Sequence, residues 1–492
     1  MNSEWLLPLL VALPVLLAGA SLLLPSARAV VRFCAAGTLG TAAFAAVAAW
    51  RAFHDGPLFA AGRWLMLDAL SAYHLAVMLT VFSLSALYAV TYFREEIERK
   101  EFTRKLARRY GGLWFGSLAA MLLVLVSNNL GIMWVGIEAT TLLTAFLICV
   151  HASPGALEAM WKYLLMCSVG VAVAFTGTLL FAASTATVLH GTDALLWTNL
   201  MESAARLDPV LVKAGFIFLV IGYGTKAGLA PMHNWLPDAH SQAPAPVSAI
   251  FSGFMLNAAL YCILRCLPVV EAATGNAGWG RGILVVFGLL SILVAAVFIV
   301  AQHDVKRLLA YHSVEHLGII ALGAGIGGIG ALAALFHTFN HSVCKALSFF
   351  CAGNLGQTYG THDMRRMTGV IRVSPVWGSG LVGTLLALIG VAPFSLFLSE
   401  FMILKAALDS GAFWAAALFL AGVGVVFVGA LRHVISMAWD PPLEAVEPQK
   451  AGWLQGALVF VPLAVLLVLG VWVPAPFMHM LTQAARLLGG AS

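Results

Sequence analysis

Charge is scarce in this 492-residue chain: Asp, Glu, Lys and Arg together make up 10% of the residues, against 61% hydrophobic types. A mean hydropathy of +0.93 excludes an ordinary water-soluble domain. Apolar runs of about 20 residues recur from end to end, and each is long enough to cross a bilayer as a helix. The net charge of +5 comes from basic residues in the loops between these runs, which indicates membrane topology and no nucleic-acid partner.

Paired cysteines are missing as well. No CxxC motif occurs, and most of the cysteines fall inside apolar runs, where they are expected to be small buried hydrophobes. The seven are Cys34, Cys149, Cys167, Cys262, Cys266, Cys344 and Cys351. Disulfides and iron–sulfur ligands are therefore not expected, and no P-loop, flavin site or haem-ligand pattern is present. We expect no bound cofactor and no metal.

The apolar runs predict an all-α polytopic membrane protein with about fourteen transmembrane helices. The expected spans lie near residues 5–24, 29–50, 68–93, 111–129, 131–150, 161–188, 210–230, 244–267, 282–302, 306–325, 329–354, 376–399, 412–438 and 453–474. The amino terminus lacks a basic region before its first apolar run, so we expect the first span to be retained.

Alternate loops differ sharply in charge. The loop at 94–109 carries seven Lys and Arg residues, whereas the loops at 189–209 and 268–281 have few charges. By the positive-inside rule, the 94–109 loop faces the cytoplasm and both termini face outward, in a cell (inner or plasma) membrane.

Two of the expected spans are interrupted by glycine and proline. Span 7 contains Gly224 and ends at Pro231, and span 12 contains Pro393. Paired interrupted spans are typical of inverted-repeat transporters, in which broken helices line polar cavities. We therefore predict two inverted five-helix repeats at 111–270 (helices 4–8) and 271–440 (helices 9–13). An N-terminal three-helix segment at 1–110 and a C-terminal helix at 441–492 flank them.

Ionisable side chains inside the spans are the candidate functional residues, because such groups are costly to bury in a membrane. A proton relay would contain Glu138, Lys226, His312, Glu315, His316, His337, His341, Lys345 and Glu400. Glu138 must be protonated or paired there, and Lys226 is the candidate partner. A static ion pair is the structural alternative.

A histidine stripe supports the relay interpretation. His337, His341 and Lys345 recur at intervals of four residues and so share one helix face. Imidazoles exchange protons near neutral pH, because each ring nitrogen can donate or accept.

Two further motifs match enzymes but lack the required context. His312-Ser-Val-Glu-His316 fits the inverted zincin pattern, yet no third ligand is identifiable from the sequence, so we expect a polar relay segment. Gly325-Ile-Gly-Gly-Ile-Gly330 fits GxGxxG without a preceding strand, and we expect a turn between spans.

Three stretches together resemble the antiporter-like, proton-translocating subunits of respiratory complex I, the L, M and N subunits of NADH–quinone oxidoreductase. The first is Lys226 followed by Pro231–Pro244, which contains His233, Asp238 and His240 on the expected cytoplasmic side. The other two are 304–318 and 337–350. The tenth-span histidines and the chain length resemble most the F-like membrane proteins of hydrogenase-4 complexes.

The resemblance implies a proton path through two half-channels joined by a central axis of ionisable residues. Glu138 and Lys226 would form a pair that senses a neighbouring subunit. His337, His341 and Lys345 would lie on the axis, and Glu400 would lie at its outer connection. Many family members carry a lysine where this chain has Asn257, so the link from Lys226 to the eleventh span would lack that charge. His312, Glu315 or His316 could take its place.

The resemblance also implies other membrane subunits as partners, with a peripheral iron–sulfur or metalloenzyme arm that performs the electron transfer. The chain would then be a non-redox, proton-pumping subunit of a hydrogenase-type or NADH:quinone-type complex. Two alternatives remain open: a subunit of a multisubunit cation/proton antiporter, and a proton-flux partner in an inorganic-carbon uptake complex.

Overall fold

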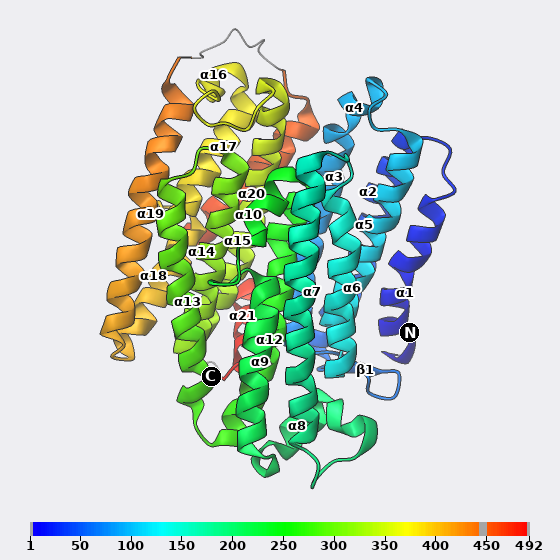
Figure 1. The fold of residues 1–492 in the computed structure, drawn as a ribbon, viewed down its shortest axis with the longest axis vertical. Helices are drawn as coiled ribbons and strands as arrows, with labels where there is room; N and C mark the ends of the chain where they lie inside the picture. The colour runs from blue at the N-terminus through cyan, green and yellow to red at the C-terminus, as the bar shows by residue number, and fades with distance from the viewer. Residues whose placement is uncertain (1–2, 442–449, 490–492) are drawn as a thin grey trace.

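The computed structural model describes residues 3–441 and 450–489, which form one helical bundle (Figure 1). In the first half of the chain the helices are α1 (Ser3–Ser21), α2 (Ala27–His54), α3 (Ala69–Tyr92), α4 (Arg94–Glu98), α5 (Arg104–Leu125), α6 (Leu130–Ile148), α7 (Pro154–Ala183), α8 (Trp197–Ser203) and α9 (Pro209–Ala227). Two 3₁₀ turns, η1 (Gly191–Leu195) and η2 (Ala204–Arg206), flank α8. Strands β1 (Leu58–Ala60) and β2 (Leu65–Leu67) form an antiparallel hairpin that the sequence did not predict.

The second half continues the bundle. Its helices are α10 (Trp235–Gln242), α11 (Ala245–Ile250), α12 (Leu256–Thr274), α13 (Ala277–Val300), α14 (Val305–Ile326), α15 (Ile329–Tyr359), α16 (Val370–Val373), α17 (Pro375–Leu388), α18 (Ser395–Asp409), α19 (Phe413–Trp439), α20 (Trp453–Val471) and α21 (Ala475–Arg486). A π-helical turn, η3 (Phe251–Met255), joins α11 to α12.

The predicted all-helical membrane fold is confirmed, because a helix or a broken helix overlies each of the expected spans. Among the described residues, ten helices are long and apolar enough to cross a membrane by length and composition. The count of fourteen spans stays a prediction. The repeats and the boundaries at residues 110, 270 and 440 likewise stay predictions.

Local side chains define where the helices begin. Asp208 accepts hydrogen bonds from the backbone N–H groups of Val210 and Leu211 and so caps α9, whose first residue is proline. Asn129 caps α6 in the same way, and Ser153 caps α7 just before another proline. These caps satisfy backbone donors that would otherwise lack partners at each helix start.

The two interruptions lie close to where the sequence placed them. Helix α9 continues through Gly224 and ends at Ala227, because Gly228 adopts the left-handed conformation (φ 76°) and its N–H caps the Gly224 carbonyl. The break therefore starts at Gly228 and includes Pro231, while Gly224 stays helical. Pro393 lies in the second break, between α17 and α18.

Glycines allow close helix crossings. A Cβ added at Gly288 of α13 would lie 2.7 Å from the Gly318 carbonyl of α14, and one added at Gly318 would lie 2.7 Å from the Gly288 carbonyl. Without side chains here, the two backbones touch directly, which is how small residues promote helix packing in membranes.

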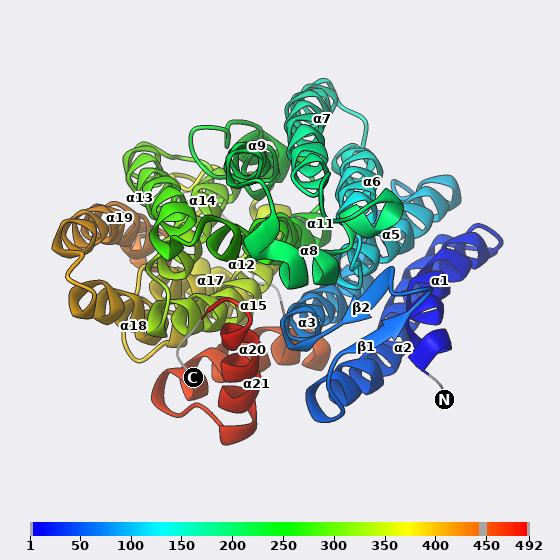
Figure 2. The same cartoon turned by 90° about the horizontal axis from the view of Figure 1, so that it is seen from below.

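The centre of the bundle is formed by α12 and α15, as the end view shows (Figure 2). The most apolar window of the α11–α12 span is entirely buried. Helices α13 and α19 lie on one side of this centre, and α1 and α2 lie on the other. Polar side chains carried by α12 and α15 are therefore shielded from lipid.

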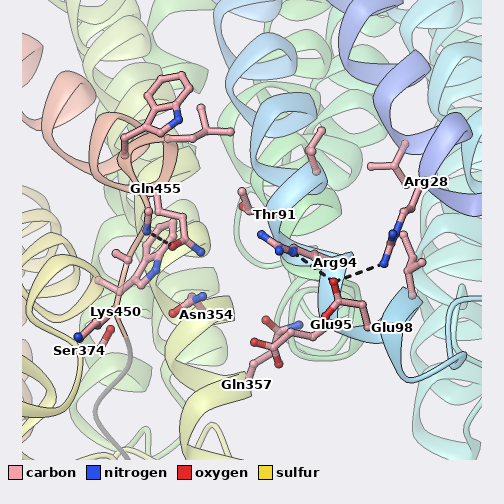
Figure 3. A pocket seen from close by; sticks show the side chains of 18 of the residues that line it. Arg28, Thr91, Arg94, Glu95, Glu98, Asn354, Gln357, Ser374, Lys450 and Gln455 are labelled. Atoms are coloured by element: carbon pink, nitrogen blue, oxygen red, sulfur yellow. Dashed lines mark hydrogen bonds and ion pairs between the residues drawn. The ribbon is translucent and has the colours of Figure 1, made fainter.

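The basic loops gather at one end of the bundle, where α4 and α16 lie, and α8 and β1 lie at the opposite end (Figure 1). A cavity of about 890 Å³ opens at the basic end, between α2, α3, α15 and α20. In it the Glu98 carboxylate lies between Arg28 and Arg94, at 3.4 and 3.3 Å (Figure 3).

Candidate functional site

Lys226 lies in the last turn of α9 and is completely buried. Its ammonium donates to Thr141 Oγ1 on α6 at 2.9 Å and to the Tyr163 hydroxyl on α7. The same ammonium lies 4.6 Å from the centre of the Tyr163 ring, a cation–π distance. Three helices therefore hold this buried amine.

Glu138 lies one turn before Thr141 on α6 and accepts a hydrogen bond from Ser168 Oγ of α7 at 3.0 Å. The expected direct contact with Lys226 is not made: no ion pair joins them in the described part of the chain, and the lysine bonds Thr141 and Tyr163 instead. The Lys226 ammonium is therefore bonded to the two hydroxyl groups of Thr141 and Tyr163, and it makes no ion pair with the Glu138 carboxylate in the described structure.

Asn257 follows the π-helical turn and occupies the centre of the bundle. Its Nδ2 donates to Ser342 Oγ of α15 at 3.2 Å and to the Gly253 carbonyl at 3.1 Å. Nearby, Ser252 and Ser313 share a hydrogen bond of 2.7 Å that joins η3 to α14. π-Helical turns frequently mark functional sites, because they re-aim side chains within a helix. Here the turn places amide and hydroxyl groups of η3, α12, α14 and α15 in contact with one another.

A histidine cluster lies beyond these polar groups, between α14, α15 and α18. His312 Nδ1 lies 2.8 Å from Glu315 Oε2, both on α14. His316 Nδ1 lies 2.9 Å from His337 Nε2 of α15, and His337 Nδ1 lies 2.8 Å from Ser399 Oγ of α18. All four ionisable side chains are completely buried.

The remaining residues of the predicted α15 stripe also face this cluster. The ring centre of His341 lies 5.3 Å from that of His316. Lys345 Nζ donates to the Leu309 carbonyl of α14. His337, His341 and Lys345 therefore line one buried face of a single uninterrupted helix, as their spacing requires.

Glu400 lies in α18 and is 7% exposed. A cavity of about 270 Å³ between α18 and α19 reaches its side chain. The carboxylate packs against Gly390 in the second helix break, where an added Cβ would lie 2.6 Å from Oε2. Glu400 thus connects the histidine cluster to the side of the bundle.

The structure adds to the sequence pattern of the His312–His316 motif, while the expectation of no bound metal stays a prediction. Ligand atoms of His312, Glu315 and His316 lie within 4.8 Å of one another, and a second group with the same spacing contains His316, His337 and Glu400. The sequence could not show the second group, because its members come from three helices.

The motif around α10 ties the first break to neighbouring helices. Asp238 forms ion pairs with Lys162 of α7 at 3.0 Å and with Arg307 of α14 at 2.7 Å. His240 is buried and stacks on Phe349 of α15, with 4.9 Å between ring centres. His233 lies in the break itself and is 4% exposed. Asp238 therefore ties the chain after the first break to α7 and α14, and both His240 and Lys345 lie against Phe349.

Several polar partners had no signal in the sequence. Tyr163, Thr141 and Ser399 are common residue types in apolar helices, and their partners lie far away in the chain.

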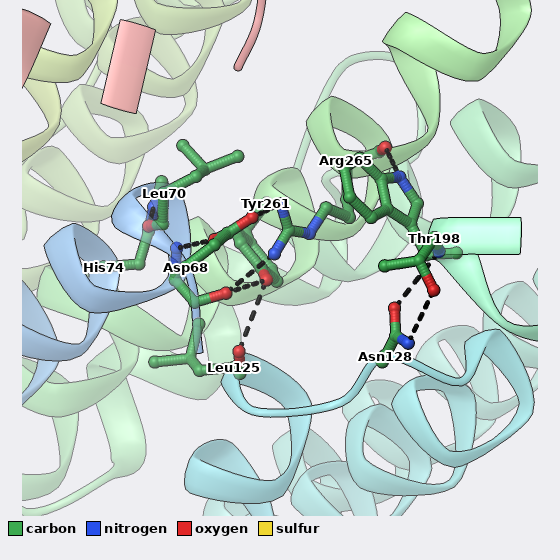
Figure 4. A network of polar contacts seen from close by, with 10 residues as sticks. Asp68, Leu70, His74, Leu125, Asn128, Thr198, Tyr261 and Arg265 are labelled. Atoms are coloured by element: carbon green, nitrogen blue, oxygen red, sulfur yellow. Dashed lines mark hydrogen bonds and ion pairs between the residues drawn. The ribbon is translucent and has the colours of Figure 1, made fainter. Parts of the chain in front are cut away.

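An additional buried network joins Asp68, at the start of α3, to Arg265 of α12 at 2.6 Å (Figure 4). Arg265 lies inside a predicted span and is a charged residue that the candidate set omitted.

These groups form three hydrogen-bonded sets, which together we call the buried row: Lys226 with Thr141 and Tyr163, Asn257 with Ser342, and the histidines with Glu315 and Ser399. Among the described residues no hydrogen bond joins one set to the next, and Glu400 has a ligand atom within 4.8 Å of His316 and His337. Each member can donate, accept or hold a proton. Imidazole nitrogens, hydroxyls and carboxyls at hydrogen-bond distances can pass a proton by exchange within each set.

Residues 127–426 match a protein family by sequence. The family is described as the transmembrane part of NADH:quinone oxidoreductases and Mrp antiporters. A hydrogenase-4 component F homolog from Methylacidiphilum infernorum is 38% identical over 417 residues, covering 84% of this chain and 86% of the relative. NADH-quinone oxidoreductase subunit N from Desulforudis audaxviator is 29% identical, covering 74% of this chain and 70% of the relative.

A solved structure shows the same fold. A chain of the membrane-bound sulfane sulfur reductase, an archaeal respiratory membrane complex, superposes with a TM-score of 0.86 at 26% identity. The match covers 98% of this chain and 97% of that chain.

Proposed function

Because this chain belongs to the NADH:quinone oxidoreductase/Mrp antiporter family of membrane proteins, we propose that it is a proton-translocating subunit of a redox-driven complex. It is a multi-pass membrane protein whose partners are other membrane subunits and a peripheral iron–sulfur or metalloenzyme arm. Electron transfer takes place in that arm, and this subunit converts it into charge movement.

The observation that carries the proposal is the buried row between Lys226 and Glu400. A scaffold has little reason to bury so many ionisable side chains in a membrane. In the proposed pathway, Glu138 and Lys226 respond to a neighbouring subunit through Thr141, Tyr163 and Ser168. Protons then move over His312, Glu315, His316, His337, His341 and Lys345, and they leave past Glu400.

The orientation and the domain division belong to the same proposal. The basic loop at 94–109 faces the cytoplasm and both termini face outward, in a cell or inner membrane. Segments 111–270 and 271–440 form the two inverted repeats, each with one broken helix, α9–α10 and α17–α18. The 38% identity to a hydrogenase-4 component F homolog favours a hydrogenase-type complex over the cation/proton antiporter.

Purification from native membranes in mild detergent, followed by mass spectrometry of the co-migrating proteins, tests the partner assignment. A set of iron–sulfur subunits with a nickel–iron or NADH-oxidising protein is expected. Recovery with small membrane subunits alone would instead identify a cation/proton antiporter. A zinc-bearing, carbonic-anhydrase-like partner would identify an inorganic-carbon uptake complex.

Proton movement tests the pathway itself. Lys226→Ala and Glu138→Gln should abolish proton translocation in energised membrane vesicles while leaving assembly of the complex largely intact. Lys213→Ala is the matched control, because Lys213 lies on the same helix α9 and packs over Trp279, at 5.6 Å, away from the row. Normal translocation by either test variant would contradict the pathway.

A further inference from the structure

The histidine cluster contains a set of side chains with the chemistry of a transition-metal site. We propose that His316, His337 and Glu400 bind one divalent ion of the Zn²⁺ class. Two imidazoles and one carboxylate are a common donor set for zinc in proteins, with a fourth position left for water. The three ligand atoms lie within 4.8 Å of one another and come from α14, α15 and α18.

The distance between the two imidazoles fits such an ion. His316 Nδ1 and His337 Nε2 are 2.9 Å apart, with one proton between them. Two nitrogens on a tetrahedral zinc ion, each about 2.05 Å from the metal, are about 3.3 Å apart. The rings need to separate by only a few tenths of an ångström for the ion to take the position of the shared proton.

Ser399 fixes the tautomer of His337. The Ser399 hydroxyl donates to the backbone carbonyls of Ser395 and Leu396, so its oxygen accepts from His337 Nδ1–H at 2.8 Å. The Nε2 lone pair of His337 then points at His316. A hydrogen bond to the second nitrogen is how proteins orient metal-binding histidines.

Two buried atoms at the site have no hydrogen-bond partner. Glu400 Oε1 and His316 Nε2 are buried and have no hydrogen-bond partner among residues 3–441 and 450–489. When the ion binds, the proton on His316 Nδ1 moves to the free Nε2 of the same ring, and any proton on Glu400 is released to solvent. The ion therefore displaces protons and requires no oxidant or reductant.

The position of Glu400 favours this set over the alternative one on α14. His312, Glu315 and His316 all lie on α14, so that set comes from a single helix. Glu400 instead comes from a different helix than either histidine, so α14, α15 and α18 would enclose the ion from three directions. The second carboxyl group, Glu315, lies close enough to His316 to offset part of the ion's charge.

An ion held between His316 and His337 interrupts the proposed row at the point where two imidazoles exchange a proton. Zn²⁺ at micromolar or lower concentrations should therefore inhibit proton translocation reversibly. This consequence rests on the proposed function, whereas metal binding itself does not.

Binding is tested on the purified full-length chain with Co²⁺, whose visible spectrum reports tetrahedral coordination by imidazole and carboxylate. One equivalent should bind with intense ligand-field bands, and His337→Gln and Glu400→Gln should each weaken binding about tenfold or more. His312→Gln is the matched control, since it removes an equally buried histidine of the α14 set and should leave the spectrum unchanged.

The outcomes of these measurements test the metal site and the proton pathway separately. Octahedral or multiple weak binding, or binding unaffected by His337→Gln in a variant that melts like the unmodified chain, overturns the metal site. Loss of the spectrum in His312→Gln with retention in His337→Gln also overturns it and assigns the ion to α14. Tight binding without inhibition of proton translocation supports the site and overturns the relay through these imidazoles.

Discussion

Arg265 Nη1 donates to Asp68 Oδ2 at 2.6 Å, and the two side chains are 1% and 4% exposed. A second guanidinium nitrogen donates to Ser71 at 2.8 Å, and the Arg265 guanidinium lies 4.4 Å from the centre of the Trp197 ring. The other carboxylate oxygen of Asp68 accepts from the Ser71 backbone N–H at 3.0 Å and so caps α3. The pair therefore ties the start of α3 to α12.

Breaking this pair should destabilise the protein strongly. Arg265→Met leaves a buried carboxylate without its partner, and removing one member of a buried pair costs about 3–5 kcal/mol. The double variant Asp68→Asn with Arg265→Met should recover much of the loss, because no uncompensated charge remains. The melting temperature in detergent measures both. A double variant no more stable than the single one would show that the guanidinium acts through packing instead.

Tyr163 is expected to be required for proton translocation. Tyr163→Phe removes the hydroxyl that accepts from Lys226, a hydrogen bond to an amine worth about 1.5–3 kcal/mol when charged, and should slow translocation roughly tenfold or more. Tyr223→Phe is the control, since Tyr223 on helix α9 is equally buried and its hydroxyl is not among the groups that bond Lys226. Initial rates in energised vesicles compare the two. Equal rates would remove Tyr163 from the pathway.

Gly390→Ala should impair translocation by displacing Glu400. Gly390 has a φ of 71°, and an added Cβ would lie 2.6 Å from Glu400 Oε2. Gly411→Ala separates the two effects, because Gly411 has a similar φ of 75° and no atom within 4 Å of an added Cβ. Both variants should lose about 1 kcal/mol through backbone strain. Only Gly390→Ala should lower the translocation rate; equal rates would contradict the role of the Glu400 position.

A pH-dependent contact lies at the basic end of the bundle. His151 Nε2 lies 3.0 Å from Glu96 Oε2, and this contact raises the pKa of His151, against the opposing effect of partial burial. A raised folded-state pKa means that the contact stabilises fully below the unfolded value of about 6.5 and is lost as pH rises through the folded value.

The difference in melting temperature between the unmodified chain and His151→Gln should therefore be largest in acid and vanish in alkaline solution. His151 is 44% exposed, so solvent screening limits the effect to about 0.5 kcal/mol or less. Arg94→Gln is a suitable reference, because it breaks an exposed ion pair at the same end of the bundle that contains no histidine. A difference that grows with pH would have the wrong sign for this contact.

Much of the architecture was readable from the sequence. The apolar runs located the helices, although α5 and α7 begin seven residues before the expected spans, and the predicted break divides the twelfth span into α17 and α18. Glycine and proline located both breaks, although Gly224 proved helical because the left-handed turn falls at Gly228. The β1–β2 hairpin was missed, since three-residue strands leave too short an alternating pattern to recognise.

The candidate residues could be identified from the sequence, whereas their hydrogen-bond partners could not. A charge or histidine in an apolar run stands out because burial is costly, and a spacing of four residues places His337, His341 and Lys345 on one face of α15. Whether Glu138 meets Lys226 depends instead on the axial offset of α6 and α9, and the structure places Thr141 and Tyr163 at that position.

The sequence by itself thus determined the helical membrane fold, the breaks and the set of buried ionisable residues, because these follow from local hydropathy and helix periodicity. Only the tertiary structure decided that His316 meets His337, that Ser399 orients that ring, and that Arg265 pairs with Asp68. These contacts join residues between 21 and 197 positions apart. They depend on how packed helices are rotated and shifted against one another, which periodicity along one helix does not encode.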